Sequence, residues 1–120
     1  MEPQAFTNEG FEQAIHQTEK PVVVVFEAPW SVACLMYRDR IVDAVELCGE
    51  DAIFGFVDID VEKELTERFS IITIPTTLIF YKEQIAKQYM GIQEPQLLQQ
   101  TVFELIGKQI PASETEPTET

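Results

Sequence analysis

The sequence is poor in sulfur, histidine and basic residues, and it contains no long apolar run. Its 120 residues include two cysteines and one histidine, and we therefore expect no metal site held by this chain alone. Eight Lys and Arg residues stand against 21 Asp and Glu, which gives a net charge of −13 at pH 7. Nucleic acids and anionic membranes would repel such a chain, so we expect neither as a partner. The charge is compatible with a basic partner, although solubility alone accounts for it.

The composition is that of one globular domain, with 45% apolar and 24% charged residues. No stretch approaches the roughly 20 apolar residues that span a bilayer. The first residues, Met-Glu-Pro-Gln, lack the basic and then apolar order of a secretory signal, so a cytoplasmic location is expected. Residues 111–120 are acidic and rich in Pro, Ser and Thr. We predict a domain over residues 1–108 and an acidic, disordered tail over 109–120.

The centre of the predicted fold is a strand that leads into a long helix. Four consecutive valines, residues 22–25, indicate a strand that is covered on both faces. Pro29 ends the strand, and Ser31 is a good N-cap for a helix over about 31–48. Cys34 then lies in the first helical turn, where backbone N–H groups and the helix dipole can stabilise a thiolate.

Further periodic segments complete an α/β pattern. The expected elements are a first helix capped by Thr7 or Asn8, a strand over 53–59, a short helix capped by Asp60, a strand over 76–81, a hairpin turn over 82–84, a returning strand over 85–90 and a last helix from Pro95. The inner stripe of the last helix is predicted to be Leu97, Leu98, Thr101, Val102, Leu105 and Ile106. This order predicts a mixed sheet flanked by helices on both faces.

The two cysteines are not expected to pair with each other. Fourteen residues of helix separate Cys34 from Cys48 by roughly 21 Å, whereas a disulfide needs Cα atoms within about 7 Å. Cys48 is interpreted as a small buried hydrophobic residue. His16 has no second histidine nearby and is expected at the surface or its boundary.

The order of the elements, the Trp30 and Cys34 spacing and the Ile-Pro-Thr segment 74–76 together resemble the thioredoxin family over about residues 6–108. Trp30 and Cys34 match the family motif Trp-Cys-x-x-Cys, with Ser31 where the first cysteine belongs. The segment 74–76, Ile-Pro-Thr, matches the family's cis-proline segment, and Asp60 and Gly91 match two further family positions. The resemblance implies the thioredoxin fold, a central mixed sheet flanked by helices on both faces. It also implies a cis peptide bond before Pro75.

Several departures from the family pattern concern its chemistry. In the family the first cysteine attacks a substrate disulfide and the second resolves the mixed disulfide. Ser31 cannot replace that nucleophile, because its hydroxyl is scarcely ionised at neutral pH, and Cys34 matches the resolving position. Val25 and Phe56 occupy the positions of a buried aspartate and a lysine that assist proton transfer in the family. Exchange needs two sulfurs within reach, so dithiol–disulfide oxidoreductase activity is not expected.

The family's peptide-binding surface is retained, and it suggests a function. The resemblance places an apolar surface at Trp30, Val32, Ile74, Pro75 and Ile92, where an extended peptide could bind. We therefore predict a redox-inactive module, of protein-binding or chaperone type, with a protein or extended peptide as its partner and no cofactor.

Two alternatives keep a role in cell redox homeostasis. In the first, Cys34 acts as a monothiol and forms mixed disulfides, although burial at this family position favours an inert thiol. In the second, Ser31 is an introduced substitution that disables a working thioredoxin. The sequence leaves the oligomeric state open.

Overall fold

The computed structural model describes residues 3–110, which fold around one five-stranded sheet. The strands are β1 (Gln4–Ala5), β2 (Val22–Glu27), β3 (Ile53–Asp58), β4 (Thr76–Tyr81) and β5 (Gln84–Met90). They lie in the order β1-β3-β2-β4-β5. The first three run parallel to one another, whereas β4 is antiparallel to both β2 and β5. The predicted mixed sheet is confirmed.

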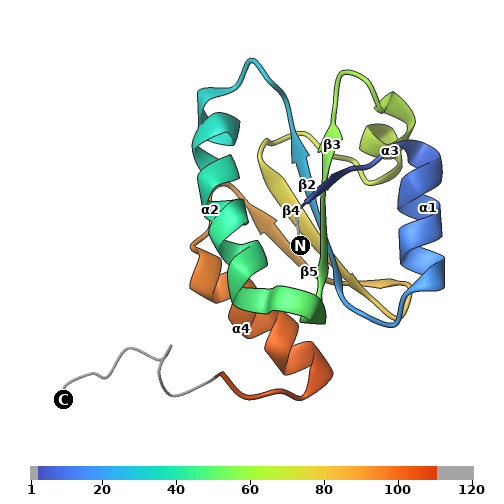
Figure 1. The fold of residues 1–120 in the computed structure, drawn as a ribbon. Helices are drawn as coiled ribbons and strands as arrows, with labels where there is room; N and C mark the ends of the chain where they lie inside the picture. The colour runs from blue at the N-terminus through green and yellow to red at the C-terminus, as the bar shows by residue number, and fades with distance from the viewer. Residues whose placement is uncertain (1–2, 111–120) are drawn as a thin grey trace.

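Helices cover both faces of this sheet. They are α1 (Asn8–Gln17), α2 (Val32–Cys48), α3 (Lys63–Arg68) and α4 (Pro95–Ile106), and a short 3-10 turn, η1 (Gly49–Asp51), follows α2. Helices α2 and α4 lie on one face, and α1 and α3 lie on the other (Figure 1). None of the helices within residues 3–110 is long and apolar enough to cross a bilayer.

The valine strand β2 is the centre of the molecule, as predicted. All six of its residues are buried between β3 and β4. Because side chains alternate along a strand, Val23 and Val25 enter the core under α2 and α4, while Val22, Val24 and Phe26 enter the core under α1 and α3. Two hydrophobic cores therefore share one strand.

The edge strand β1 was not predicted, because two residues are too few for a period-2 pattern. Gln4 and Ala5 pair with Gly55 and Phe56 of β3. The next residue, Phe6, is buried against Gly55, and a Cβ added at Gly55 would lie 2.2 Å from the Phe6 ring. Glycine at position 55 therefore lets the N-terminal segment approach the sheet.

Two helix predictions were wrong in detail. The predicted cap Asp60 does not begin α3, which starts at Lys63 after Glu62.

In α4 the buried face is rotated relative to the predicted stripe. Three predicted residues are buried, namely Leu98, Thr101 and Val102, and Gln99 and Phe103 are buried with them. The other three predicted residues, Leu97, Leu105 and Ile106, are only half-buried. The side chain of Gln99 donates to the Leu47 carbonyl at 3.2 Å, near the end of α2. Packing against α2 therefore sets the rotation.

The hairpin between β4 and β5 closes with a two-residue turn. Lys82 and Glu83 adopt φ values of 53° and 67°, in the left-handed region that such turns require. β5 starts at Gln84, one residue earlier than predicted.

The acidic residues of the predicted tail, 111–120, lie outside the described residues, whereas Ile110 packs against the core under α2 and α4.

Candidate functional site

The candidate site lies where β2 ends and α2 begins, at the upper end of the sheet in Figure 1. Ser31 is the N-cap of α2, and its Oγ accepts a hydrogen bond from the Cys34 backbone N–H at 3.2 Å. Cys34 is 2% exposed. At the family's nucleophile position the chain therefore has a hydroxyl that caps a helix, with a buried thiol behind it.

Trp30 is exposed and is held by a carboxylate from the neighbouring strand end. Its indole Nε1 donates to Asp60 Oδ2 at 2.7 Å, and the Asp60 backbone N–H donates to Asp58 Oδ1 at 2.9 Å. The indole is nevertheless 67% exposed. The sequence interpretation gave Asp60 a different role as a helix cap. The contact between Trp30 and Asp60 could have been anticipated, because the carboxyl ends of the parallel strands β2 and β3 meet at one edge of the sheet.

The segment that contains Pro75 lies beside this helix start. The Ile74–Pro75 peptide bond is cis, and Thr76 pairs with Phe26 at the end of β2. The Pro75 carbonyl accepts from the Gly91 N–H at 2.8 Å, which brings the end of β5 to the same place. The turn after β3, the segment before β4 and the end of β5 thus meet at the start of α2.

The predicted partner-binding residues differ in exposure. Val32 is 70% exposed, Ile74 and Ile92 are half-buried, and Pro75 is buried. Further exposed apolar side chains were not predicted, namely Val61 after β3, Ile72 before β4 and Met90 at the end of β5. We call the set Trp30, Val32, Val61, Ile72, Ile74 and Met90 the apolar end surface. An exposed surface of this kind is typical of an interaction site.

The second cysteine is remote from this surface. Cys48 is the last residue of α2 and is buried, and it is not joined to Cys34 in a disulfide. The unbroken helix between them keeps the two sulfurs roughly 21 Å apart, at 1.5 Å per residue. No pair of thiols at the apolar end surface can form or open a disulfide.

The interior behind Cys34 contains closed polar pairs that the sequence analysis missed. Val25 and Phe56 are buried at the positions of the family's aspartate and lysine. Glu27, 7% exposed, instead accepts from Arg38 Nε at 3.1 Å and from its Nη2. The Arg38 guanidinium also lies 4.1 Å from the centre of the Phe56 ring. An ion pair is therefore present two residues further along β2, at Glu27.

Tyr37 forms a second closed pair on this face. Its hydroxyl lies 2.7 Å from Thr77 Oγ1, deep in the core. Burial raises the pKa of Tyr37 to about 12, although the hydrogen bond to Thr77 acts in the opposite direction. The tyrosine is therefore neutral at physiological pH.

The described residues contain no cluster of three or more His, Cys, Asp or Glu side chains that could hold a metal ion. His16 is exposed, and its ring nitrogens contact Glu83 at 2.9 Å and Glu12 at 3.1 Å. This contact joins α1 to the hairpin turn, far from Trp30 along the sheet. We assign His16 a structural role.

Taken together, the fold and site define a class of protein. A mixed sheet between two helical layers, with Trp and Cys at the start of the helix after the central strand and a cis-proline beside them, is the thioredoxin fold. Solved structures that share it include chloroplastic thioredoxin z, with a TM-score of 0.80 and 20% identity; the match covers 89% of this chain and 96% of that one. Another is mitochondrial thioredoxin 3 of Saccharomyces cerevisiae, with a TM-score of 0.76 and 19% identity; the match covers 85% of this chain and 94% of that one.

Sequence comparison then identifies the family. The thioredoxin family model matches residues 2–104, and the chain belongs to the thioredoxin family. A thioredoxin of Alicyclobacillus acidocaldarius is 30% identical over 100 residues, which are 83% of this chain and 94% of that protein. The mitochondrial thioredoxin of Bos taurus is 27% identical over 97 residues, 81% of this chain, which spans only 58% of that relative's length.

Proposed function

We propose that this chain is a redox-inactive member of the thioredoxin family that binds extended protein segments at the apolar end surface. Exposed Trp30 and Val32 lie there beside the Ile74–Pro75 segment, and Val61, Ile72 and Met90 enlarge the surface. An extended segment bound across it would bury apolar area and use backbone hydrogen bonds. Binding of this kind requires no nucleophile.

One observation carries the proposal. The position of the attacking thiol is occupied by Ser31, and its oxygen accepts the Cys34 N–H as a helix cap. The remaining thiol at this end is 2% exposed, so a substrate disulfide cannot reach it without local opening. Because disulfide exchange proceeds through a thiolate and a resolving thiol, the observed arrangement supports binding rather than turnover.

Turnover of insulin disulfides tests the redox part. We expect the protein with dithiothreitol to reduce insulin no faster than dithiothreitol alone. Ser31→Cys restores a second thiol, but we expect it to stay slow, because Val25 provides no carboxylate behind the site. Catalysis by the unaltered protein would contradict the proposal. Brisk catalysis by Ser31→Cys alone would favour the alternative of a working thioredoxin disabled at one residue.

Alkylation tests the remaining alternative, a monothiol enzyme that uses Cys34. Buried structural cysteines are inert, so we expect iodoacetamide to modify the folded protein slowly and the urea-unfolded protein rapidly. Cys48→Ala isolates the Cys34 signal in a mass spectrum. Rapid modification of the folded variant at neutral pH would identify Cys34 as accessible and revive the monothiol enzyme.

Fluorescence tests the binding part directly. Trp30 is the single tryptophan of the chain, and its emission reports on ligands at this surface. Carboxymethylated insulin B chain is an extended probe that lacks tryptophan. We expect it to bind, and we expect Ile74→Asp to abolish the response. Ile85→Asp is the matched control, since Ile85 is an exposed isoleucine in β5, next to the hairpin turn. Equal binding by both variants would place the interaction elsewhere.

A further inference from the structure

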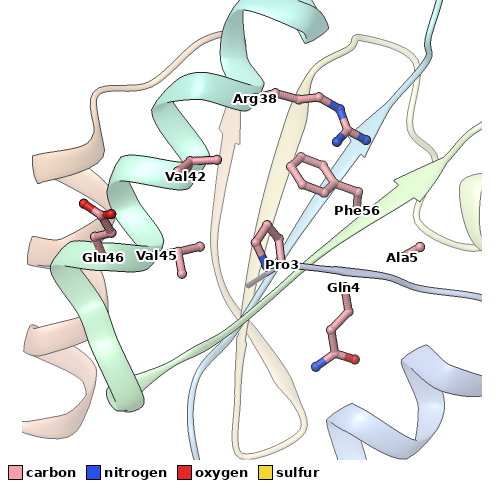
Figure 2. Close-up of a pocket in the computed structure, with 8 residues that line it drawn as sticks. All are labelled: Pro3, Gln4, Ala5, Arg38, Val42, Val45, Glu46 and Phe56. Carbon is pink, nitrogen blue, oxygen red and sulfur yellow. The ribbon is translucent and has the colours of Figure 1, made fainter. Parts of the chain in front are cut away.

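A second surface adjoins the first, along the edge of the sheet. A hollow of about 720 Å³ lies between β1 and α2, and its apolar lining includes Pro3, Val42, Val45 and Phe56 (Figure 2). A smaller hollow of about 260 Å³ lies between β1 and the segment after β3. The two share Ala5, Arg38 and Phe56 in their linings and are therefore adjacent; we call the pair of hollows the β1 groove.

The floor of the β1 groove contains Arg38, a half-exposed cation that is paired with a buried carboxylate. Arg38 lies over the Phe56 ring with its guanidinium 4.1 Å from the ring centre, and it forms two hydrogen bonds to the buried carboxylate of Glu27. Its charge is therefore used inside the protein. Figure 2 shows the flat guanidinium and the ring between β1 and α2.

The walls of the β1 groove carry uncompensated negative charge. Asp58 and Glu62 line the smaller hollow, and Glu46 lines the larger one. Among residues 3–110, no lysine or arginine forms an ion pair with any of these three carboxylates. Exposed valines lie beside them at the two ends, with Val61 68% and Val42 49% exposed. The lining of the groove thus contains both acidic and apolar side chains in each hollow.

We propose that the β1 groove binds an extended, cationic segment of a partner protein. A Lys or Arg side chain would occupy the smaller hollow between Asp58 and Glu62, and an apolar side chain would pack on Val42 and Phe56 in the larger hollow. An extended occupant is favoured because β1 is the edge strand and pairs with β3 on one side only. Opposite charge supplies orientation and speed of association, and burial of apolar area supplies affinity.

The groove meets the apolar end surface at Val61, which belongs to both. Val61 lines the groove and directly follows Asp60, the residue that holds Trp30. One bound segment can therefore continue from one surface to the other. The inference does not rest on the proposed function, because Asp58, Glu62 and Val42 line the groove and are not residues of the apolar end surface.

A charge-matched pair of variants tests the proposal. The probe is a capped peptide of sequence Gly-Ser-Lys-Val-Lys-Val-Lys-Ser-Gly, titrated into ¹⁵N-labelled protein by NMR. The test variant is Asp58→Asn with Glu62→Gln, which keeps an oxygen to accept the Asp60 and Asn8 backbone N–H groups. The control is Asp43→Asn with Glu67→Gln, which removes the same charge from exposed positions outside both hollows.

We expect shift changes in β1, in residues 56–62 and along the groove side of α2, and weaker binding at higher salt. The test variant should bind roughly 5- to 10-fold more weakly than the control, as the loss of two partly screened charge pairs predicts. Val42→Ser should weaken binding further without changing its salt dependence.

Four results would overturn the proposal. These are no saturation up to about 1 mM peptide, equal affinity of the test and control variants, equal binding of a peptide with Glu for every Lys, and shift changes confined to Trp30 and residues 72–76. None of these results contradicts the proposed function, and the last would support it, because it would place the peptide on the apolar end surface.

Discussion

The two faces of the sheet differ in the side chains that they bury: one face is packed with aromatic rings, and the other also contains paired polar groups. Under α1 and α3 the core is aromatic: the Phe11 ring meets Phe69 and Phe80 edge to face, with ring centres 5.5 and 5.2 Å apart, and Phe26 meets Phe69 at 6.2 Å. These rings need no hydrogen-bond partner. Stability on this face comes from apolar area and ring geometry.

The face under α2 and α4 buries polar groups as well as apolar ones, and each has a partner. Glu27 is paired with Arg38, Tyr37 with Thr77, and Tyr89 with Thr101 at 2.7 Å. Val25 and Phe56, which stand at the positions of the family's proton-transfer residues, lie on this face, and the polar side chains of the face are paired with one another. The comparison teaches that the apolar residues Val25 and Phe56 do not make this face a plain apolar core. The polar groups were instead closed into pairs.

The largest expected effect lies on the aromatic face. Phe11 is 1% exposed and contacts several rings, so Phe11→Ala should lower the free energy of unfolding by about 3–5 kcal/mol. Urea unfolding followed by circular dichroism measures it. A loss below about 1.5 kcal/mol would show that the rings can collapse into the space, and that this face is less tightly packed than the structure indicates.

The ion pair on the other face should respond differently to one and to two substitutions. Arg38→Met leaves the Glu27 carboxylate buried without its partner, and because Arg38 itself is half exposed we expect a loss of about 2 kcal/mol. Glu27→Met together with Arg38→Met should recover most of that loss, since a well-packed apolar pair can replace a buried ion pair. Urea unfolding of Arg38→Met, of Glu27→Met and of the double variant gives the coupling free energy between the two side chains. Additive losses would mean that the two side chains do not act as a pair.

The sequence predicted most of the elements because their signals are local. The valine strand, the helix over about 31–48 with Gly49 after it, and the hairpin all follow from spacing, caps and turn residues. The rotation of α4 does not, because contact with α2 selects its buried face, and the polar side chain of Gln99 is buried against the Leu47 carbonyl.

The candidate site was harder to predict for the same physical reason. Its residue types were visible, since Ser31, Cys34 and Pro75 are adjacent to recognisable strand and helix ends. The contacts that position them join distant segments: Trp30 bonds to Asp60 thirty residues away, and Glu27 to Arg38 eleven residues away on another element. Glu27, a charged residue in an otherwise apolar strand, was a signal for a buried partner that the sequence analysis did not use.

The Tyr37–Thr77 pair should show a smaller effect with a distinct pH dependence. Tyr37→Phe leaves Thr77 without its partner and should cost about 1–2 kcal/mol at neutral pH. The folded pKa of about 12 lies above the value near 10 for an unfolded tyrosine. The folded state thus holds this proton longer, and the associated stability is present below pH 10 and lost between about pH 10 and 12. Unfolding midpoints measured across that range should fall more steeply for the unaltered protein than for Tyr37→Phe, and parallel curves would contradict the assignment.

The smallest effect compares the two helix caps, one on each face. Ser31 Oγ accepts from Cys34 N–H at 3.2 Å, and Thr7 Oγ1 accepts from Gly10 N–H at 3.0 Å. If Ser31 is only a cap, Ser31→Ala and Thr7→Ala should each lower the free energy of unfolding by about 1 kcal/mol. Ser31→Ala should also leave binding of the insulin B chain unchanged. Because alanine keeps the helix start and removes one oxygen, a loss of binding that Thr7→Ala does not share would give this hydroxyl a role in recognition. The site would then have exchanged its nucleophile for a ligand-binding group.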